Sequence, residues 1–392
     1  MKKSIAGNIL LLVVVMALTV VITEALLMVL GISHPRLVQR DDNVGTAYRP
    51  GIAFIQKDEG EAHIKINPEG FRDKEREIQK PLNTIRIAVV GDSYTDAFSV
   101  PVEMRYTEIL ENEINNNCNA LGGRKVEVLN FGMSGYGTAQ ELQVLRHKVW
   151  KYSPDLVILG FLPYNDVRNN SRALEKNDGI PYFLYKDEKL ELDADFRDSP
   201  SHHQTWQKVV GYKIVDNSRV AQVLYRINVL VKDYFLTQEQ GRVKKKDTPL
   251  EVGLDDSVFY PPKDAVWEDA WRVTEGIISL MSKEVSGHGA GFLLVTLTQG
   301  TVVHPDESVW REFQSKLGVK NLNYPQQRMS AFALRQGIDI LNLVEPFRKY
   351  ARDNQVYLHG FENTELGKGH WNIEGNQLAG KMIAEKVCSG FY

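Results

Sequence analysis

A serine and a late histidine stand in the two segments of this sequence that best suit nucleophilic chemistry. Ser93 belongs to the tripeptide Gly91-Asp92-Ser93, directly after an apolar run, and His370 lies in a glycine-rich segment near the end of the chain. A serine hydroxyl becomes a useful nucleophile when a base accepts its proton, and histidine is the commonest such base. Ser93 and His370 are therefore the candidate nucleophile and base, with inert helix caps as the alternative interpretation.

Two further segments offer hydrogen-bond donors for a developing oxyanion. Gly135 lies in the glycine-rich segment 130–137, where missing side chains let the backbone approach a ligand closely. Asn165 follows another apolar run and carries an amide that donates without adding charge. The Gly135 N–H and the Asn165 side chain are the candidate oxyanion donors. A plain glycine turn and an Asx turn are the alternatives.

Elements of alternating type must position these residues. The last helix predicted below follows His370, while Ser93, Gly135 and Asn165 each follow a predicted strand, as expected at the ligand-binding edge of an open sheet. Strands alternating with helices predict an α/β fold with a mostly parallel sheet and right-handed crossovers. The Gly-x-Ser-x-Gly elbow is absent, which argues against the α/β-hydrolase version of the same chemistry. The predicted strands are 84–90, 125–129, 155–161, 292–297 and 338–343, and the predicted helices are 106–115, 139–151, 264–285, 324–336 and 373–387.

Composition argues against several other classes of protein. The formal net charge of −3 gives no basic field for nucleic acid. No phosphate-binding glycine motif is present, and no Cys/His set has zinc-like spacing, so we expect neither a cofactor nor a metal. The chain has 2 cysteines, Cys118 and Cys388. They could pair in an oxidising compartment, but two separate buried thiols are the favoured interpretation.

The N-terminus predicts a membrane anchor. Lys2 and Lys3 precede an apolar run from Ile9 to Ile32, which is long enough to span a bilayer and has no convincing signal cleavage site. We interpret residues 1–35 as an uncleaved signal anchor with a cytoplasmic N-terminus, and a cleaved signal peptide is the alternative. Either way the body is predicted on the extracytoplasmic side, periplasmic or extracellular. Glu24 is placed near the outer interface.

The rest of the chain divides by composition. Residues 36–83 show no sustained periodicity and suit a stalk and lead-in, and residues 84–392 form the predicted catalytic domain. An aromatic-rich insertion at about 171–263 is too long for an ordinary connection and predicts a cap or subdomain. Its basic run, Arg242–Lys246, is interpreted as a solvated loop, with contact to an anionic glycan or a lipid headgroup as the alternative.

In order along the chain, Gly-Asp-Ser at Ser93, the glycine loop at Gly135, Asn165 and the late His370 resemble the four blocks of the SGNH (GDSL-type) hydrolases. The resemblance covers about 84–170 and 290–388. It implies a flavodoxin-like three-layer α/β/α fold and Ser93 attacking an ester carbonyl. It also implies an oxyanion hole from the Ser93 and Gly135 amides and the Asn165 side chain. The segment before the first predicted strand is also similar to one found in anchored bacterial members of this family. We interpret it mainly as a structural brace, and its matching residues are Asn67, Gly70, Phe71 and Arg72.

The sequence departs from the family pattern at one position. The family places an aspartate three residues before its histidine, where it orients the imidazole, but Gly367 stands there. Glu365 is one candidate for the acid partner of His370, and a backbone carbonyl or another acid is the alternative. The departure also leaves open a degenerate, non-catalytic protein.

Location and resemblance together favour an exported esterase. The expected substrates are carboxylic esters, with acetyl esters on an envelope or secreted polysaccharide preferred. An O-acyltransferase that passes the acyl group to a sugar hydroxyl would use the same site, and a glycan-binding or assembly subunit on an inactive fold is the third hypothesis. The expected partners are the acylated glycan, the membrane and a membrane-bound polysaccharide machinery, without nucleic acid.

Overall fold

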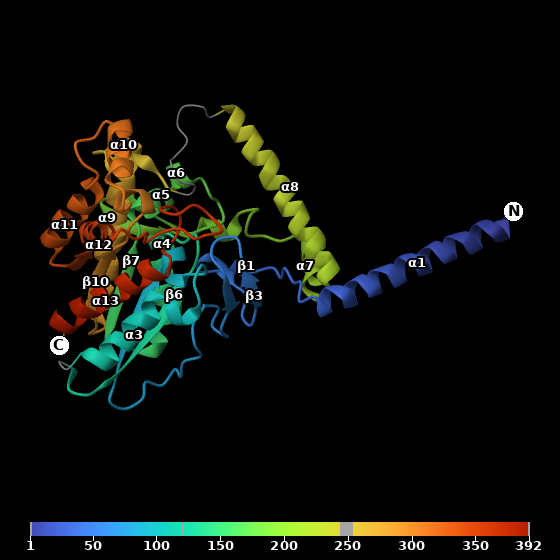
Figure 1. Cartoon of the computed structure of the whole chain (residues 1–392), viewed down its shortest axis with the longest axis horizontal. Coiled ribbons are helices and arrows are strands. Elements are labelled where there is room, and N and C mark those ends of the chain that lie inside the picture. The colour runs from blue at the N-terminus through green and yellow to red at the C-terminus, as the bar shows by residue number, and fades with distance from the viewer. Residues whose placement is uncertain (1, 119–120, 244–253, 391–392) are drawn as a thin grey trace. The chain divides into compact units, whose positions relative to one another are not determined.

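The computed structural model describes residues 2–118, 121–243 and 254–390 (Figure 1). The chain divides into two compact units. The helical unit comprises Met1–Gln39 and His203–Thr248, and the sheet unit comprises Arg40–His202 and Pro249–Tyr392. The lead-in from residue 40 onward therefore belongs to the same unit as the predicted catalytic body, and the 171–263 insertion is divided between the two units.

The sheet unit is built on five parallel strands in the order β11-β10-β7-β5-β6. Numbered along the chain within this sheet, that order is 2-1-3-4-5 read from the opposite edge, which is the flavodoxin-like arrangement. The predicted α/β class with a parallel sheet is confirmed. The three inner strands are almost wholly buried because helices cover both faces. The strands are β5 (Thr84–Gly91), β6 (Lys125–Gly132), β7 (Leu156–Phe161), β10 (Gly291–Thr296) and β11 (Asp339–Asn342).

Helices on both faces of the sheet complete three layers (Figure 1). Helices α3 and α13 pack against each other on one face, while α4 and α9 pack together on the other. Each helix was predicted from its spacing, although α4 is shorter than the predicted 139–151 because the chain turns through π- and 3₁₀-type segments from Leu145 to Tyr152. The helices are α3 (Tyr106–Asn117), α4 (Thr138–Val144), α9 (Ala265–Gly287), α11 (Tyr324–Gln336) and α13 (Ile373–Gly390).

Short elements that the sequence did not reveal surround this sheet. Three two-stranded sheets contain strands of four or five residues, too short to show a reliable alternation. They pair β1 (Val38–Asp41) with β2 (Gly45–Tyr48), β3 (Ala53–Gln56) with β4 (Ala62–Lys65), and β8 (Tyr182–Lys186) with β9 (Lys189–Asp193). The additional helices are α2 (Ser93–Asp96), α5 (Pro163–Asn169), α6 (Arg172–Glu175), α10 (Glu307–Leu317) and α12 (Val344–Asn354).

The helical unit contains α1 (Lys2–Val29), α7 (Trp206–Asn217) and α8 (Arg219–Val243). Within the described part of the chain, Gly7–Val29 of α1 is the one segment long and apolar enough to cross a bilayer. By length and composition this helix fits a membrane anchor or a signal sequence. Lys244–Lys246 of the basic run lie outside the described residues.

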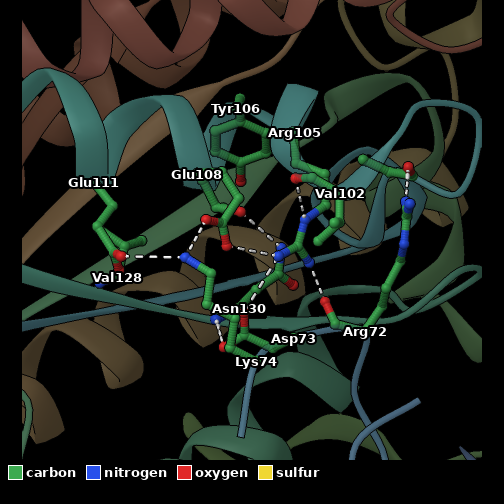
Figure 2. Close-up of polar contacts among 12 residues, drawn as sticks. Arg72, Asp73, Lys74, Val102, Arg105, Tyr106, Glu108, Glu111, Val128 and Asn130 are labelled. Carbon is green, nitrogen blue, oxygen red and sulfur yellow. Dashed lines mark hydrogen bonds and ion pairs between the residues drawn. The ribbon is translucent and has the colours of Figure 1, made fainter. Parts of the chain in front are cut away.

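The lead-in braces the loop that carries Ser93, as expected for Arg72 from the sequence. The Arg72 guanidinium is buried and donates to the carbonyl oxygens of Asp96, Ala97 and Val100. Beside it, Arg105 donates to the carbonyl of Arg72, as Figure 2 shows.

A buried ionic network continues this brace into the sheet (Figure 2). Arg105 pairs with Glu108 at 2.9 Å and with Asp73 at 3.3 Å, and the other Asp73 oxygen accepts the Asn130 N–H at 3.1 Å. Because breaking one member of a buried ion pair leaves an uncompensated charge, this network fixes the start of α3 against β6.

Cys118 and Cys388 form a disulfide, with their Cα atoms 5.7 Å apart. The favoured prediction of two separate thiols is therefore wrong. Cys118 directly follows α3 and Cys388 lies in the last turn of α13, so the packing of these two helices brings together residues that are 270 apart in the chain.

We expect the double substitution Cys118→Ser and Cys388→Ser to lower the free energy of unfolding of the full chain by about 2–5 kcal/mol. The cross-link closes a long loop and so limits the freedom of the unfolded chain. Denaturant unfolding measured with and without a thiol reductant checks this expectation. The reductant should destabilise the natural chain and leave the double variant unchanged, and an equal response of both would contradict it.

Candidate active site

Ser93 lies just after the carboxyl end of β5, beside the point between β5 and β7 where the strand order reverses. Gly91 pairs with Gly132 of β6 on one side and with Gly160 of β7 on the other, so the segments after all three strands meet here. Asp92 accepts the Tyr94 N–H at 2.9 Å and thereby caps α2, which begins at Ser93. This is where open α/β sheets bind ligands.

The Ser93 and His370 side chains, which the sequence singled out as nucleophile and base, lie together. The Oγ of Ser93 is 2.8 Å from Nε2 of His370, which is hydrogen-bond distance. The Tyr94 ring packs beside the imidazole at a centroid distance of 5.0 Å, and its hydroxyl donates to the Gly369 carbonyl at 3.1 Å. The residue after the serine therefore helps to hold the loop of the histidine.

The acid beside His370 is Glu59, in the turn between β3 and β4. Its Oε2 lies 2.5 Å from the Nδ1 of His370, and its Oε1 accepts the backbone N–H of His370 at 2.7 Å. This two-point contact fixes both the ring and the main chain of the histidine. With Nδ1–H donating to the carboxylate, Nε2 is left to accept a proton from Ser93.

Contacts from two other segments hold the Glu59 turn in place. Asn363 donates to the carbonyls of Lys57 and Gly60 and accepts the Gly60 N–H at 3.0 Å. Ser99 Oγ donates to Glu59 Oε2 at 3.2 Å. Sequence reasoning missed both Glu59 and Asn363, because neither belongs to a motif and the 36–83 segment showed no periodicity.

Glu365, the acid suggested by the sequence, is not the residue beside the imidazole. Its carboxylate is exposed and pairs with Lys368 at 2.7 Å. The aspartate position of the family pattern is also closed here. Gly367 has φ +84°, and a Cβ added to it would lie 2.4 Å from the His304 ring. A side chain at position 367 would collide with His304, so the carboxylate beside His370 comes from another segment, at Glu59.

The predicted oxyanion donors follow β6 and β7: Gly135 lies in the loop after β6, and Asn165 lies in the first turn of α5, just after β7. The Asn165 amide donates one N–H to Asp92 at 3.0 Å, which orients the amide and leaves its second N–H for another acceptor. Asp96 accepts the backbone N–H and the hydroxyl of Ser134, at 2.6 Å and 2.7 Å. This carboxylate of α2 thus ties the loop of Gly135, whose φ is +80°, to the turn of Ser93.

Electrostatics set the protonation states around His370. Burial lowers the pKa of His370, but the hydrogen bond and the negative charge of Glu59 outweigh it and raise this pKa above its usual value. Burial also raises the pKa of Glu59, yet the contacts with His370 leave it below its usual value. Because the pKa of Glu59 is lowered and that of His370 is raised, Glu59 is ionised wherever His370 could act as a base. Burial raises the pKa of the neighbouring Asp92 to about 6.

A second histidine in this region is neutral. Burial lowers the pKa of His359 to about 3. Its Nε2 lies 2.8 Å from the Thr298 hydroxyl, and its Nδ1 lies 2.8 Å from the Gly369 carbonyl, to which it donates. His359 therefore positions the loop that carries His370 and is not a second base.

The raised pKa of His370 predicts the acid side of the pH profile. As the pH falls through this pKa, Nε2 becomes protonated and can no longer accept the proton of Ser93. We expect kcat/KM for an ester to fall toward acid pH with a midpoint above the usual value for a histidine. A profile measured on the full chain checks this, and a midpoint at or below the usual value would contradict it.

Gly369 leaves the space that the Glu59 carboxylate occupies. A Cβ on Gly369, whose φ is +78°, would lie 2.1 Å from Glu59 Oε1. We expect Gly369→Ala to displace Glu59 and to lower kcat/KM by about 100-fold, because small errors in position are costly in catalysis. Gly318→Ala is the matched control, since Gly318 has φ +68° with nothing within 4 Å of an added Cβ. Equal activity of the two variants would show that the contact with Glu59 is unimportant.

No protein-family model and no curated protein matches the chain. Solved structures match it over most of its length. The acetyl xylan esterase AlAXEase is 14% identical and covers 77% of this chain and 99% of its own, with a TM-score of 0.38. A catalytic mutant of the acetylxylan esterase Axe2 from Geobacillus stearothermophilus is 10% identical and covers 78% and 94%, with a TM-score of 0.39. A lipolytic protein of the G-D-S-L family from Desulfitobacterium hafniense is 12% identical and covers 76% and 98%, with a TM-score of 0.34.

Proposed function

We propose that this protein is a serine esterase of the SGNH type, with Ser93 as nucleophile, His370 as base and Glu59 as the acid that orients the base. The observation that carries the proposal is the continuous hydrogen-bonded chain from the Ser93 hydroxyl through both imidazole nitrogens to the Glu59 carboxylate. A nucleophile, a base and an orienting carboxylate in this order form the arrangement that acyl transfer requires.

The reaction proceeds in two steps, acylation of Ser93 and hydrolysis of the acyl-serine. The Ser93 Oγ attacks the ester carbonyl carbon while Nε2 of His370 takes the hydroxyl proton, and the carbonyl oxygen becomes an oxyanion. The Ser93 and Gly135 amides and the Asn165 side chain donate to that oxygen. The bond between the carbonyl carbon and the alcohol oxygen then breaks, and the alcohol leaves with the proton from His370. The acyl group stays on Ser93 as an acyl-serine. Water then attacks this ester with His370 again acting as base, and the acid and free Ser93 are released.

The substrates that we propose are acetyl esters on an envelope or secreted polysaccharide. The location supports this class, because α1 fits an anchor and the Cys118–Cys388 disulfide suits an oxidising compartment outside the cytoplasm. On this proposal the sheet unit is extracytoplasmic and works beside the machinery that makes or exports the polysaccharide.

Three measurements on the purified full chain test the proposal. A fluorophosphonate probe should label Ser93, and a chromogenic acetyl ester should be hydrolysed. Acetyl transfer is examined by supplying the same donor with and without an oligosaccharide acceptor and weighing the products. Release of the whole acetyl group as acetate supports the esterase, whereas acetylated oligosaccharide would assign the site to a transferase. Folded protein that the probe does not label would exclude the mechanism.

A further inference from the structure

Glu24, a carboxylate in the last two turns of the apolar helix α1, caps another helix of the helical unit. Its two oxygens accept the backbone N–H groups of Arg219 at 2.6 Å and Val220 at 3.1 Å, and the Ser218 hydroxyl at 2.9 Å. Arg219 and Val220 are the first two residues of α8, and Ser218 directly precedes them. The first N–H groups of a helix have no partner within the helix. The sequence placed Glu24 near the outer interface of the membrane without giving it this partner.

The residues just after α1 bind the same pair of helices. The amide oxygen of Gln222 accepts from Ser33 at 3.1 Å and from the His34 N–H at 3.0 Å. Arg36 pairs through two nitrogens with Asp216 of α7, at 3.0 Å and 2.8 Å. The end of α1 is thus part of the folded helical unit. Cleavage of a signal peptide after α1 would remove the cap of α8, which favours a retained anchor.

Helices α7 and α8 expose apolar side chains close to this junction. On α7 they recur at the spacing of one helical face, and Trp206 at its first turn is 71% exposed. On α8, Leu224 is 62% exposed and Ile227 50%. Figure 1 shows α8 diverging from α1 beyond their junction. The exposed aliphatic residues of this pair together with its exposed tryptophan, which we call the hairpin face, are Trp206, Val209, Val210, Ile214, Leu224, Ile227, Leu230 and Val231.

We propose that the hairpin face lies in the lipid bilayer, at the boundary between headgroups and acyl chains, and that α7 and α8 form an interfacial support for the anchor. The inference rests on α1 spanning the membrane, as proposed above. A bilayer is already the partner of Gly7–Val29, and Glu24 joins the end of that span directly to the first turn of α8. The hairpin face therefore begins where the membrane surface must lie.

The chemistry of the two helices fits a lipid surface. Tryptophan concentrates at the membrane interface because its ring is apolar and its N–H is polar, and Trp206 stands exposed at the start of α7. Exposed lysines accompany the apolar residues, namely Lys208 and Lys213 on α7 and Lys232 on α8. Apolar side chains together with basic ones are typical of helices that bind anionic lipid headgroups.

Trp206 is a selective reporter for this proposal. The chain has 6 tryptophans, and the other five (Trp150, Trp267, Trp271, Trp310 and Trp371) all belong to the sheet unit. The full chain is reconstituted in nanodiscs of phosphatidylcholine and phosphatidylglycerol, with either natural or brominated acyl chains. Bromine quenches tryptophan fluorescence on contact. We expect brominated lipid to quench part of the emission of the natural chain, and this quenched part to vanish in Trp206→Phe.

Further variants and outcomes complete the test. Val210→Asp combined with Ile214→Asp should reduce the quenching at least twofold while the chain stays in the nanodisc and its rate on a soluble acetyl ester is unchanged. Equal quenching of the natural chain and Trp206→Phe would overturn the proposal. An unquenched Trp206, together with cross-linking of two chains through α7, would also overturn the proposal and would assign the hairpin face to a second copy of the chain. Loss of the N-terminal residues from the mature chain by mass would also overturn it. The assay needs no ester substrate, so an inactive enzyme would not affect its result.

Discussion

Ser93→Ala is expected to lower kcat/KM for an acetyl ester by about 10⁴- to 10⁶-fold and to abolish labelling by a fluorophosphonate probe. The variant removes the Ser93 Oγ, which is the one hydrogen-bond partner of His370 Nε2 among the described residues. The remaining oxyanion donors and binding contacts can still supply a small residual rate, so the loss is large but finite.

A matched serine and a folding measurement make this result specific. Ser279 lies on α9, where its hydroxyl donates to Gln336 far along the sequence from the site residues. Ser279→Ala should keep the natural rate, and both variants should keep the natural unfolding midpoint. Substantial hydrolysis by folded Ser93→Ala would remove this residue from the mechanism. His370→Ala should resemble Ser93→Ala, because the two residues act as a unit.

Glu59→Gln is expected to lower kcat/KM by about 10²- to 10⁴-fold, although Glu59 lies 311 residues from His370 in the chain. The amide is nearly the same size as the carboxylate but carries no charge, so it no longer stabilises the imidazolium that forms when His370 takes the proton. An amide can also present its NH₂ group to Nδ1 and hold the ring in the wrong tautomer. Steady-state kinetics on the full chain measure the loss.

Two controls separate this role from a general effect of losing an acid. Glu365→Gln changes the acid that the sequence suggested, and because this residue pairs only with Lys368 in the described contacts, its rate should stay within about twofold of the natural chain. The pH profile gives the second control. The charge of Glu59 raises the pKa of His370, so in Glu59→Gln the acid limb should move to lower pH. A larger loss in Glu365→Gln, or an unmoved limb in Glu59→Gln, would contradict the assignment of the acid.

Residue types and local spacing determined the central body of this protein. The apolar β-branched run before Gly91 predicted a strand buried on both faces, and so did the other apolar runs of the sheet. Because parallel strands present their carboxyl ends at one edge, the sequence also predicted that Ser93, Gly135 and Asn165 lie at that edge. His370 followed from its place just before the last predicted helix.

Contacts between distant segments were decided only by the tertiary structure. Glu59 lies in the turn of a hairpin with four-residue strands, which leave no readable alternation, and nothing in its neighbours distinguishes it from other surface acids. The disulfide required α3 and α13 to lie side by side, and the role of Glu24 required the end of α1 to meet α8. Periodicity reports which face of an element is covered, but a hydrogen bond or an ion pair depends on which two side chains come within about 3 Å. That proximity is set by how the whole chain packs.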